Sequence, residues 1–64
     1  MPLINVKMLS GRTQETKNEL VDVLTKETCR VLKVKPEAVW IVIDEYSKDS
    51  WAEGGQFFSQ KIRS

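Results

Sequence analysis

The stretch Val39-Trp40-Ile41-Val42-Ile43 (residues 39–43) is apolar at every position. A β-strand turns successive side chains to opposite faces of its sheet, so this run places hydrophobic groups on both faces. Strands of this kind are normally covered on both sides. Because one helix covers one face only, the second face needs another chain. The stretch therefore predicts a buried strand in an oligomeric protein.

A strand and a helix precede this run. Residues 3–9 alternate, with Ile4, Val6 and Met8 on one side of the expected strand. A helix over about residues 14–33 follows, with Thr13 as its N-cap. Its apolar stripe at helical spacing consists of Leu20, Val21, Leu24, Thr28, Val31 and Leu32. A strand–helix–strand order is a βαβ unit, so we expect parallel strands joined by a right-handed crossover.

The chain turns polar after the apolar run. Residues 44–50 are interpreted as a polar connection, and Gly54-Gly55 as a turn between two short extended segments. The expected fold class is α/β: a β-α-β subunit with parallel strands and a short C-terminal hairpin. Residues 1–64 form a single domain in this interpretation.

Length and composition also favour assembly. A chain of 64 residues buries only about 60% of its unfolded surface and is marginally stable alone. The single cysteine, Cys29, excludes an internal disulfide, and without histidine there is no zinc-ligand spacing, so no metal site is expected. Oligomerisation is the remaining route to a stable core.

Charge and hydropathy exclude two classes of partner. The net charge is +1, and no basic block or aromatic RNA motif argues for nucleic acid. No apolar run approaches the roughly 20 residues of a membrane span, and lysine and asparagine interrupt the first apolar stretch, which argues against a signal peptide. We expect a soluble, cytoplasmic protein that binds neither nucleic acid nor membrane.

Pro2 is the first candidate for chemistry, since without histidine no Ser/His/Asp or Cys/His site can form. Once Met1 is removed, the proline nitrogen is a secondary amine. Its pKa would start from about 7.7–8.0, and burial among apolar side chains would lower that pKa further. Such an amine is a usable general base, although the residue taken alone is better explained as a proline that merely begins a strand.

Three further residues suit a small-molecule site. Arg12 follows the first strand, and a guanidinium holds a carboxylate with two parallel hydrogen bonds. Trp51 could wall an apolar pocket or pack at an interface, and Glu53 lies in the same loop. Taken singly, each of the three also fits an ordinary surface or packing role.

Taken together, these features resemble the 4-oxalocrotonate tautomerase family, which uses a catalytic amino-terminal proline. The resemblance covers about residues 2–55. The matching motifs are M-P-L-I-N-V-K-M-L at 1–9, G-R-T at 11–13, P-x-x-V-W-I-V-I-D-E at 36–45 and W-A-E-G-G at 51–55. It implies a β-α-β subunit whose dimers build a homohexamer, with a heteromer as the alternative. It also implies a cofactor-independent enzyme acting on a small carboxylate.

The resemblance implies a role for each candidate residue. Pro2 is the general base that shuttles a proton between oxygen and carbon of a 2-hydroxy-dienoate or enolpyruvate acid. Arg12 binds the substrate carboxylate. Trp51 takes the place of a pocket phenylalanine, and Leu9 and Trp40 line the same pocket.

Trp40 departs from the family pattern. The tautomerases carry a second arginine there, which polarises the substrate's carbonyl oxygen. An indole donates one neutral N–H hydrogen bond, and losing a preorganised donor at a developing oxyanion costs about 3–4 kcal/mol. We therefore expect a monoacid, such as an aryl enolpyruvate, to suit the site better than a dicarboxylate dienol.

Glu53 supports a second interpretation. It aligns with the glutamate that activates water in the related trans-3-chloroacrylic acid dehalogenase, whose corresponding subunit also has an aromatic at the position of Trp40. The protein would then be a cofactor-free hydratase or dehalogenase of unsaturated three-carbon acids, using Pro2, Arg12 and Glu53. Leu9 agrees instead with the tautomerases, because that dehalogenase has an arginine there. In a third interpretation the chain is a non-catalytic subunit of a heteromeric assembly.

Overall fold

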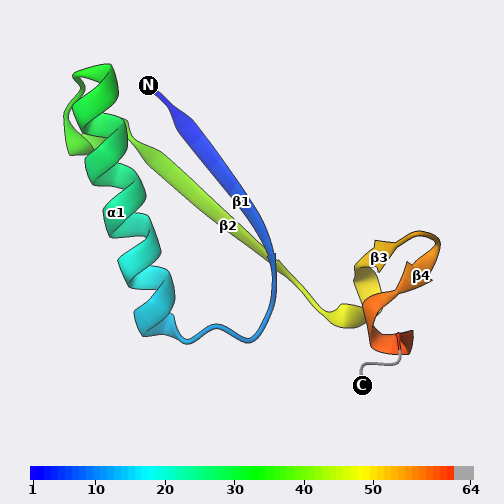
Figure 1. Cartoon of the computed structure of the whole chain (residues 1–64). Helices are drawn as coiled ribbons and strands as arrows, with labels where there is room; N and C mark the ends of the chain where they lie inside the picture. The colour runs from blue at the N-terminus through cyan, green and yellow to red at the C-terminus, as the bar shows by residue number, and fades with distance from the viewer. Residues whose placement is uncertain (62–64) are drawn as a thin grey trace.

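The computed structural model describes residues 1–61, which form a β-α-β unit followed by a small hairpin (Figure 1). The helices and strands are β1 (Leu3–Leu9), α1 (Gln14–Leu32), β2 (Trp40–Tyr46), β3 (Ala52–Glu53) and β4 (Gln56–Phe57). Short 3-10 turns occupy Pro36–Ala38, Lys48–Ser50 and Phe58–Gln60. The predicted fold class is confirmed.

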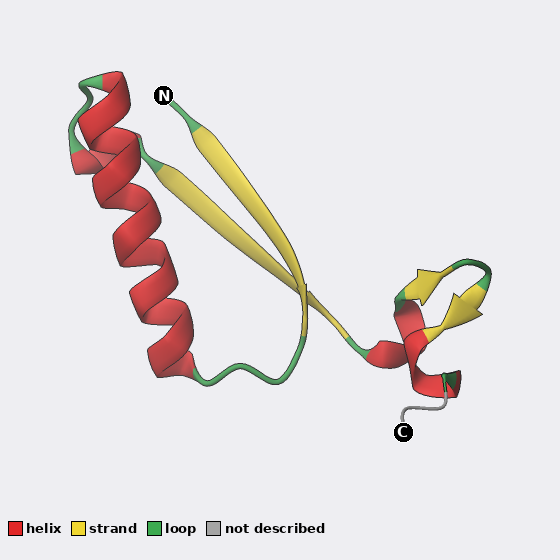
Figure 2. Cartoon of the chain, viewed as in Figure 1, coloured by secondary structure: helices red, strands yellow, loops and turns green. Residues whose placement is uncertain are grey.

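The two long strands pair in parallel, with Leu3 opposite Trp40 at one end and Leu9 opposite Tyr46 at the other. The pairing extends one step beyond each end of β1. The backbone N–H of Trp40 donates to the Pro2 carbonyl at 3.0 Å, and that of Ser10 donates to the Tyr46 carbonyl at 2.8 Å. Helix α1 lies along one face of this two-stranded sheet (Figure 2).

The prediction of a polar connection over residues 44–50 was wrong for its first part, because β2 continues through Tyr46. The polar side chains find partners on both faces of the sheet. Asp44 pairs with Lys7 of β1 at 3.1 Å, and Glu45 pairs with Lys17 of α1 at 2.8 Å. Cross-strand pairing of this kind lets charged residues continue a strand that apolar residues began.

Helix α1 begins where its cap was predicted and ends one residue early. The backbone N–H of Thr16 donates to the Thr13 side-chain oxygen at 3.1 Å, which satisfies one of the free donors of the first turn. At the other end Lys33 adopts the left-handed conformation, with φ of 59°, and its N–H donates to the Cys29 carbonyl at 2.9 Å. The left-handed residue stops the helix after Leu32.

The C-terminal hairpin pairs Ala52 with Phe57 and Glu53 with Gln56. Its two-residue turn is Gly54-Gly55, with φ of +61° and +83°. Two consecutive positive φ values favour glycine and match the turn that fits the twist of paired strands. The predicted hairpin is therefore confirmed, and its turn depends on both glycines.

The two faces of the β1–β2 sheet differ in exposure. On the helix side, Ile4, Val6, Met8, Ile41 and Ile43 are half-buried. On the opposite face, Leu3, Trp40 and Val42 are 62%, 55% and 44% exposed. We call this opposite face, which carries Leu3, Asn5, Lys7, Trp40, Val42, Asp44 and Tyr46, the open face. It is the uncovered face that the apolar stretch predicted.

The chain is extended rather than compact. Its Cα radius of gyration is 15.3 Å, whereas a compact chain of this length would have a value of about 11 Å. No hydrophobic side chain of residues 1–61 is buried. Within the same residues, no helix is long and apolar enough to cross a membrane. The described part of the chain thus has no closed core of its own.

Candidate active site

Pro2 lies at the start of β1, beside the C-terminal end of α1 (Figure 1). Its carbonyl is fixed by the Trp40 N–H, and its ring is half-buried. It borders a shallow depression of about 380 Å³, lined by Pro2, Ile4, Glu27, Thr28, Val31 and Leu32. The lining of this hollow is largely apolar, and Glu27 is the one ionisable side chain among the described residues that line it.

Trp40 lies at the same end of the sheet as Pro2 but faces the other way. Its side chain is on the open face opposite Leu3, whereas Pro2 borders the hollow on the helix side. The Trp40 backbone contacts Pro2 through the hydrogen bond to its carbonyl. Within one chain, the indole therefore does not line the hollow beside Pro2.

Leu9 and Arg12 lie at the opposite end of β1. Leu9 pairs with Tyr46, and Arg12 follows in the exposed connection to α1. The Arg12 side chain has no hydrogen-bond or ion-pair partner among residues 1–61. A seven-residue strand is about 20 Å long, so Pro2 and Arg12 of one chain cannot hold the same small substrate.

Trp51 and Glu53 lie beyond the far end of β2. The Trp51 ring packs edge-on against Tyr46, with ring centroids 6.1 Å apart. It also packs against Phe58 in a tilted arrangement, with centroids 6.5 Å apart. The Glu53 carboxylate accepts a hydrogen bond from Lys61 Nζ at 2.6 Å. Lys61 Nζ also lies 5.2 Å from the centroid of the Phe58 ring. These contacts form one cluster at the hairpin.

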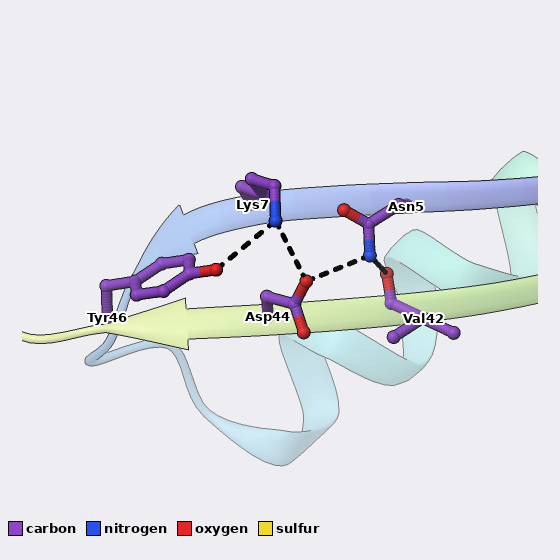
Figure 3. A network of polar contacts seen from close by, with 5 residues as sticks. All are labelled: Asn5, Lys7, Val42, Asp44 and Tyr46. Carbon is purple, nitrogen blue, oxygen red and sulfur yellow. Dashed lines mark hydrogen bonds and ion pairs between the residues drawn. The ribbon is translucent and has the colours of Figure 1, made fainter.

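A polar network on the open face was missed by the sequence analysis (Figure 3). Lys7 Nζ donates to Asp44 Oδ2 at 3.1 Å and to the Tyr46 hydroxyl at 3.2 Å. Asn5 Nδ2 donates to Asp44 Oδ2 at 3.0 Å and to the Val42 carbonyl at 3.5 Å. The alternation of β1 puts Asn5 and Lys7 on one face of the strand. Their partners Asp44 and Tyr46 lie in the segment that was predicted to be a polar connection and that belongs to β2.

The network shifts the pKa values of its two ionisable groups that form an ion pair, Asp44 and Lys7. The hydrogen bonds from Asn5 and then Lys7 lower the pKa of Asp44, because they stabilise the carboxylate. The Tyr46 hydroxyl and then Asp44 raise the pKa of Lys7. Both groups are solvent-accessible, so solvent and salt screen their interaction. The network keeps one carboxylate and one ammonium charged and paired on an otherwise apolar face.

Metal ligands do not gather in the described region. Residues 1–61 contain no group of three or more His, Cys, Asp or Glu side chains that could hold a metal ion. The candidate groups are instead a proline, an arginine, two tryptophans and a carboxylate, distributed between the two ends of the sheet. Proton transfer and carboxylate binding are the chemistry that these groups can perform.

The β-α-β subunit and the proline at position 2 are features that this chain shares with the tautomerases that its sequence resembles. The family model described as "Tautomerase enzyme" matches residues 2–61. The chain therefore belongs to the tautomerase family, and the resemblance seen in the sequence is confirmed.

Individual relatives agree with this assignment. The chain is 37% identical to a 2-hydroxymuconate tautomerase of Bacillus subtilis, over 92% of this chain and 95% of that protein. A crystallised 4-oxalocrotonate tautomerase homologue is 40% identical, with a TM-score of 0.92, and the match covers 98% of this chain and all of that one.

A third relative is a heterohexamer. It is a 4-oxalocrotonate tautomerase from Chloroflexus aurantiacus, 30% identical with a TM-score of 0.87 over 94% of this chain and 97% of that one. Assembly from unlike chains therefore occurs in a tautomerase that is similar to this protein.

Proposed function

We propose that this protein is a cofactor-independent tautomerase of 2-hydroxy-dienoate or enolpyruvate-type acids. The position of Pro2 is the main observation that supports this proposal. Pro2 directly precedes β1, is anchored through its carbonyl by the Trp40 N–H, and borders a largely apolar hollow. Family membership supports the same activity. After removal of Met1, Pro2 presents a secondary amine there.

In the proposed reaction Pro2 is the general base. Its neutral nitrogen accepts the proton of the substrate's 2-hydroxyl group, and the O–H electron pair becomes the C=O π bond. The electrons of the enol double bond then take the proton from the prolyl ammonium at carbon. The amine returns to its neutral form, so the reaction needs no oxidant, reductant or metal.

Arg12 binds the substrate carboxylate in this proposal, and Leu9, Trp40 and Trp51 form apolar walls. Since Pro2 and Arg12 lie at opposite ends of β1, each complete site needs groups from more than one chain. The open face, with its exposed Leu3 and Val42, supports such an assembly. We infer a homohexamer built as a trimer of dimers.

The test is ultraviolet-monitored ketonisation of phenylenolpyruvate, using protein whose mass shows that Met1 is absent. The expected result is a rate well above buffer that collapses in Pro2→Ala. A preparation that retains Met1 is a matched control, because its Pro2 nitrogen is a tertiary amide without basicity. Activity that is equal in all three preparations would exclude Pro2 as the base.

The Glu53 carboxylate beside Trp51 supports a second candidate function, hydration or dehalogenation of unsaturated three-carbon acids. Pro2 would then be a cationic general acid, Arg12 would bind the carboxylate, and Glu53 would position water. Halide release from 3-chloroacrylate separates this function from tautomerisation. Glu53→Gln should abolish that release.

The third candidate function is that of a non-catalytic subunit in a heteromeric assembly. The similar heterohexameric tautomerase from Chloroflexus aurantiacus supports it. Sedimentation of the purified chain tests it. A stable homohexamer with ketonisation activity supports the tautomerase. A chain that assembles and acts only after a second tautomerase-like chain is added supports the heteromer.

A further inference from the structure

We propose that the ion pair between Glu53 and Lys61 restricts the site to substrates with one carboxylate. When the Glu53 charge is removed, the Lys61 ammonium becomes a second cation that can bind the second carboxylate of a diacid. The inference rests on the proposed tautomerase function and deepens it to a substrate class. It starts from a gap in that site, because Trp40 provides no positive charge at the position where the tautomerases that the sequence resembles have a second arginine.

Lys61 is held in one place by two contacts. Its ammonium donates to Glu53 Oε1 at 2.6 Å and lies 5.2 Å from the centroid of the Phe58 ring. Its side chain is only 20% exposed, whereas that of Glu53 is 70% exposed. The ammonium is thus positioned by the hairpin, and its carboxylate partner is the more accessible member of the pair.

The pair is part of the same cluster as Trp51. Phe58, which the Lys61 ammonium approaches, packs against the Trp51 ring, and its N–H donates to the Trp51 carbonyl at 2.8 Å. Glu53 is two residues from Trp51 and pairs with Gln56 across the hairpin. Wherever Trp51 forms the wall of a substrate pocket, the Glu53–Lys61 pair therefore accompanies it.

The charges determine which substrate this arrangement admits. A monoacid needs one cation, and Arg12 supplies it. The second carboxylate of a diacid would meet the Glu53 charge beside Lys61, so attraction and repulsion largely cancel. Removing the Glu53 charge leaves the Lys61 ammonium available to that second carboxylate. A single substitution should then shift the preference from monoacids toward diacids.

The experiment measures kcat/KM for phenylenolpyruvate, a monoacid, and 2-hydroxymuconate, a diacid, in Glu53→Gln and in the parent protein. We expect the diacid-to-monoacid ratio to rise about fivefold at low salt, as one exposed charge contact implies, mainly through KM of the diacid. The gain should shrink when salt is added, because exposed charges are screened. In Lys61→Gln, which keeps the Glu53 charge, the ratio should fall.

Two controls make the result specific. Glu53→Gln/Lys61→Gln should return the ratio to near its parent value, because the second cation is gone. Asp22→Asn changes the net charge equally and leaves Lys26 without its partner on α1, but should not move the ratio.

Either an unchanged ratio in Glu53→Gln or a rise that persists in the double variant overturns the inference. If the parent protein ketonises phenylenolpyruvate, that failure concerns the ion pair alone. If the parent protein ketonises neither acid, the proposed function itself fails.

Discussion

Asp44 shows at the scale of one residue how a charged side chain is accommodated on the open face. Asn5 and Lys7 both donate hydrogen bonds to one oxygen of the Asp44 carboxylate. The Lys7 ammonium also donates to the Tyr46 hydroxyl. The lowered pKa of Asp44 means that the folded protein favours the carboxylate. Its stabilising contribution is present above the unfolded-state pKa of about 3.9 and is lost as pH falls through the depressed folded-state pKa.

In Asp44→Asn, the thermal stability of the protein should therefore depend less on pH in the acid range. Between about pH 6 and about pH 3, the thermal midpoint of the parent protein should fall more steeply than that of the variant, since only in the parent does unfolding take up a proton at this position. Scanning calorimetry across that range, at one protomer concentration, measures the difference. Parallel curves would show that the network contributes nothing to the pH dependence.

Trp40→Arg is the residue-scale test of the departure from the family pattern. An arginine at the start of β2 would supply a charged donor toward the developing oxyanion, so kcat for 2-hydroxymuconate should rise by up to about 10²-fold. Trp40→Gln, which adds a neutral donor, is the matched control. Equal kcat values in Trp40→Arg and Trp40→Gln, measured by ultraviolet absorbance, would contradict a role for charge at this position.

At the scale of the element, α1 is the best specified part of the chain. Its N-cap and its first residue were predicted, since both depend on neighbours within four positions. Of the predicted apolar stripe, Leu20, Val21, Leu24 and Thr28 are half-buried, whereas Val31 and Leu32 are exposed. Its end came one residue early because Lys33 turns into the left-handed region without a glycine to signal it. The length of β2 was underestimated, because the partners of Asp44 and Glu45 come from β1 and α1.

The candidate site residues also divide into features that local sequence predicts and features that depend on long-range contacts. Pro2, Arg12, Trp51 and Glu53 could be proposed from local motifs, but their separation in space depends on the parallel pairing of β1 and β2. The Lys61 partner of Glu53 was not predicted, because the hairpin turn had to bring residues eight apart into contact. Long-range pairing is the information that hydrophobic periodicity lacks.

Thr13→Ala should destabilise the protein by about 1 kcal/mol, the usual contribution of an N-cap side chain. The substitution removes the acceptor of the Thr16 N–H and leaves that donor to water. Thr13→Ser keeps the hydroxyl and should retain most of the stability. Urea unfolding at a fixed protomer concentration compares them, and equal loss in both variants would contradict a capping role.

At the scale of the whole molecule, the chain has an open face and no closed core. The sheet is covered by α1 on one side, while Leu3, Trp40 and Val42 remain exposed on the other. Burying such apolar area contributes about 25 cal/mol per Å², so covering the open face would add to the stability of the protein. Its paired Lys7 and Asp44 lower the cost of bringing a neighbour against it.

Val42→Glu should dissociate the assembly, because the substitution places an additional carboxylate in the middle of the open face. Val42→Thr has nearly the same volume, carries no charge, and should stay assembled. Analytical ultracentrifugation gives the mass of each variant. An intact oligomer in Val42→Glu would show that this face is not a contact between chains.

Parallel pairing places Pro2 and Arg12 at opposite ends of one strand, so in the proposed mechanism each site draws on neighbouring chains. Two defective proteins should then rescue each other. Pro2→Ala and Arg12→Ala are each expected to be inactive, but when they are unfolded together and refolded as a mixture, some sites combine an intact proline with an intact arginine. Recovery of phenylenolpyruvate ketonisation in the mixture would demonstrate complementation between subunits, and its absence would assign both residues to one chain.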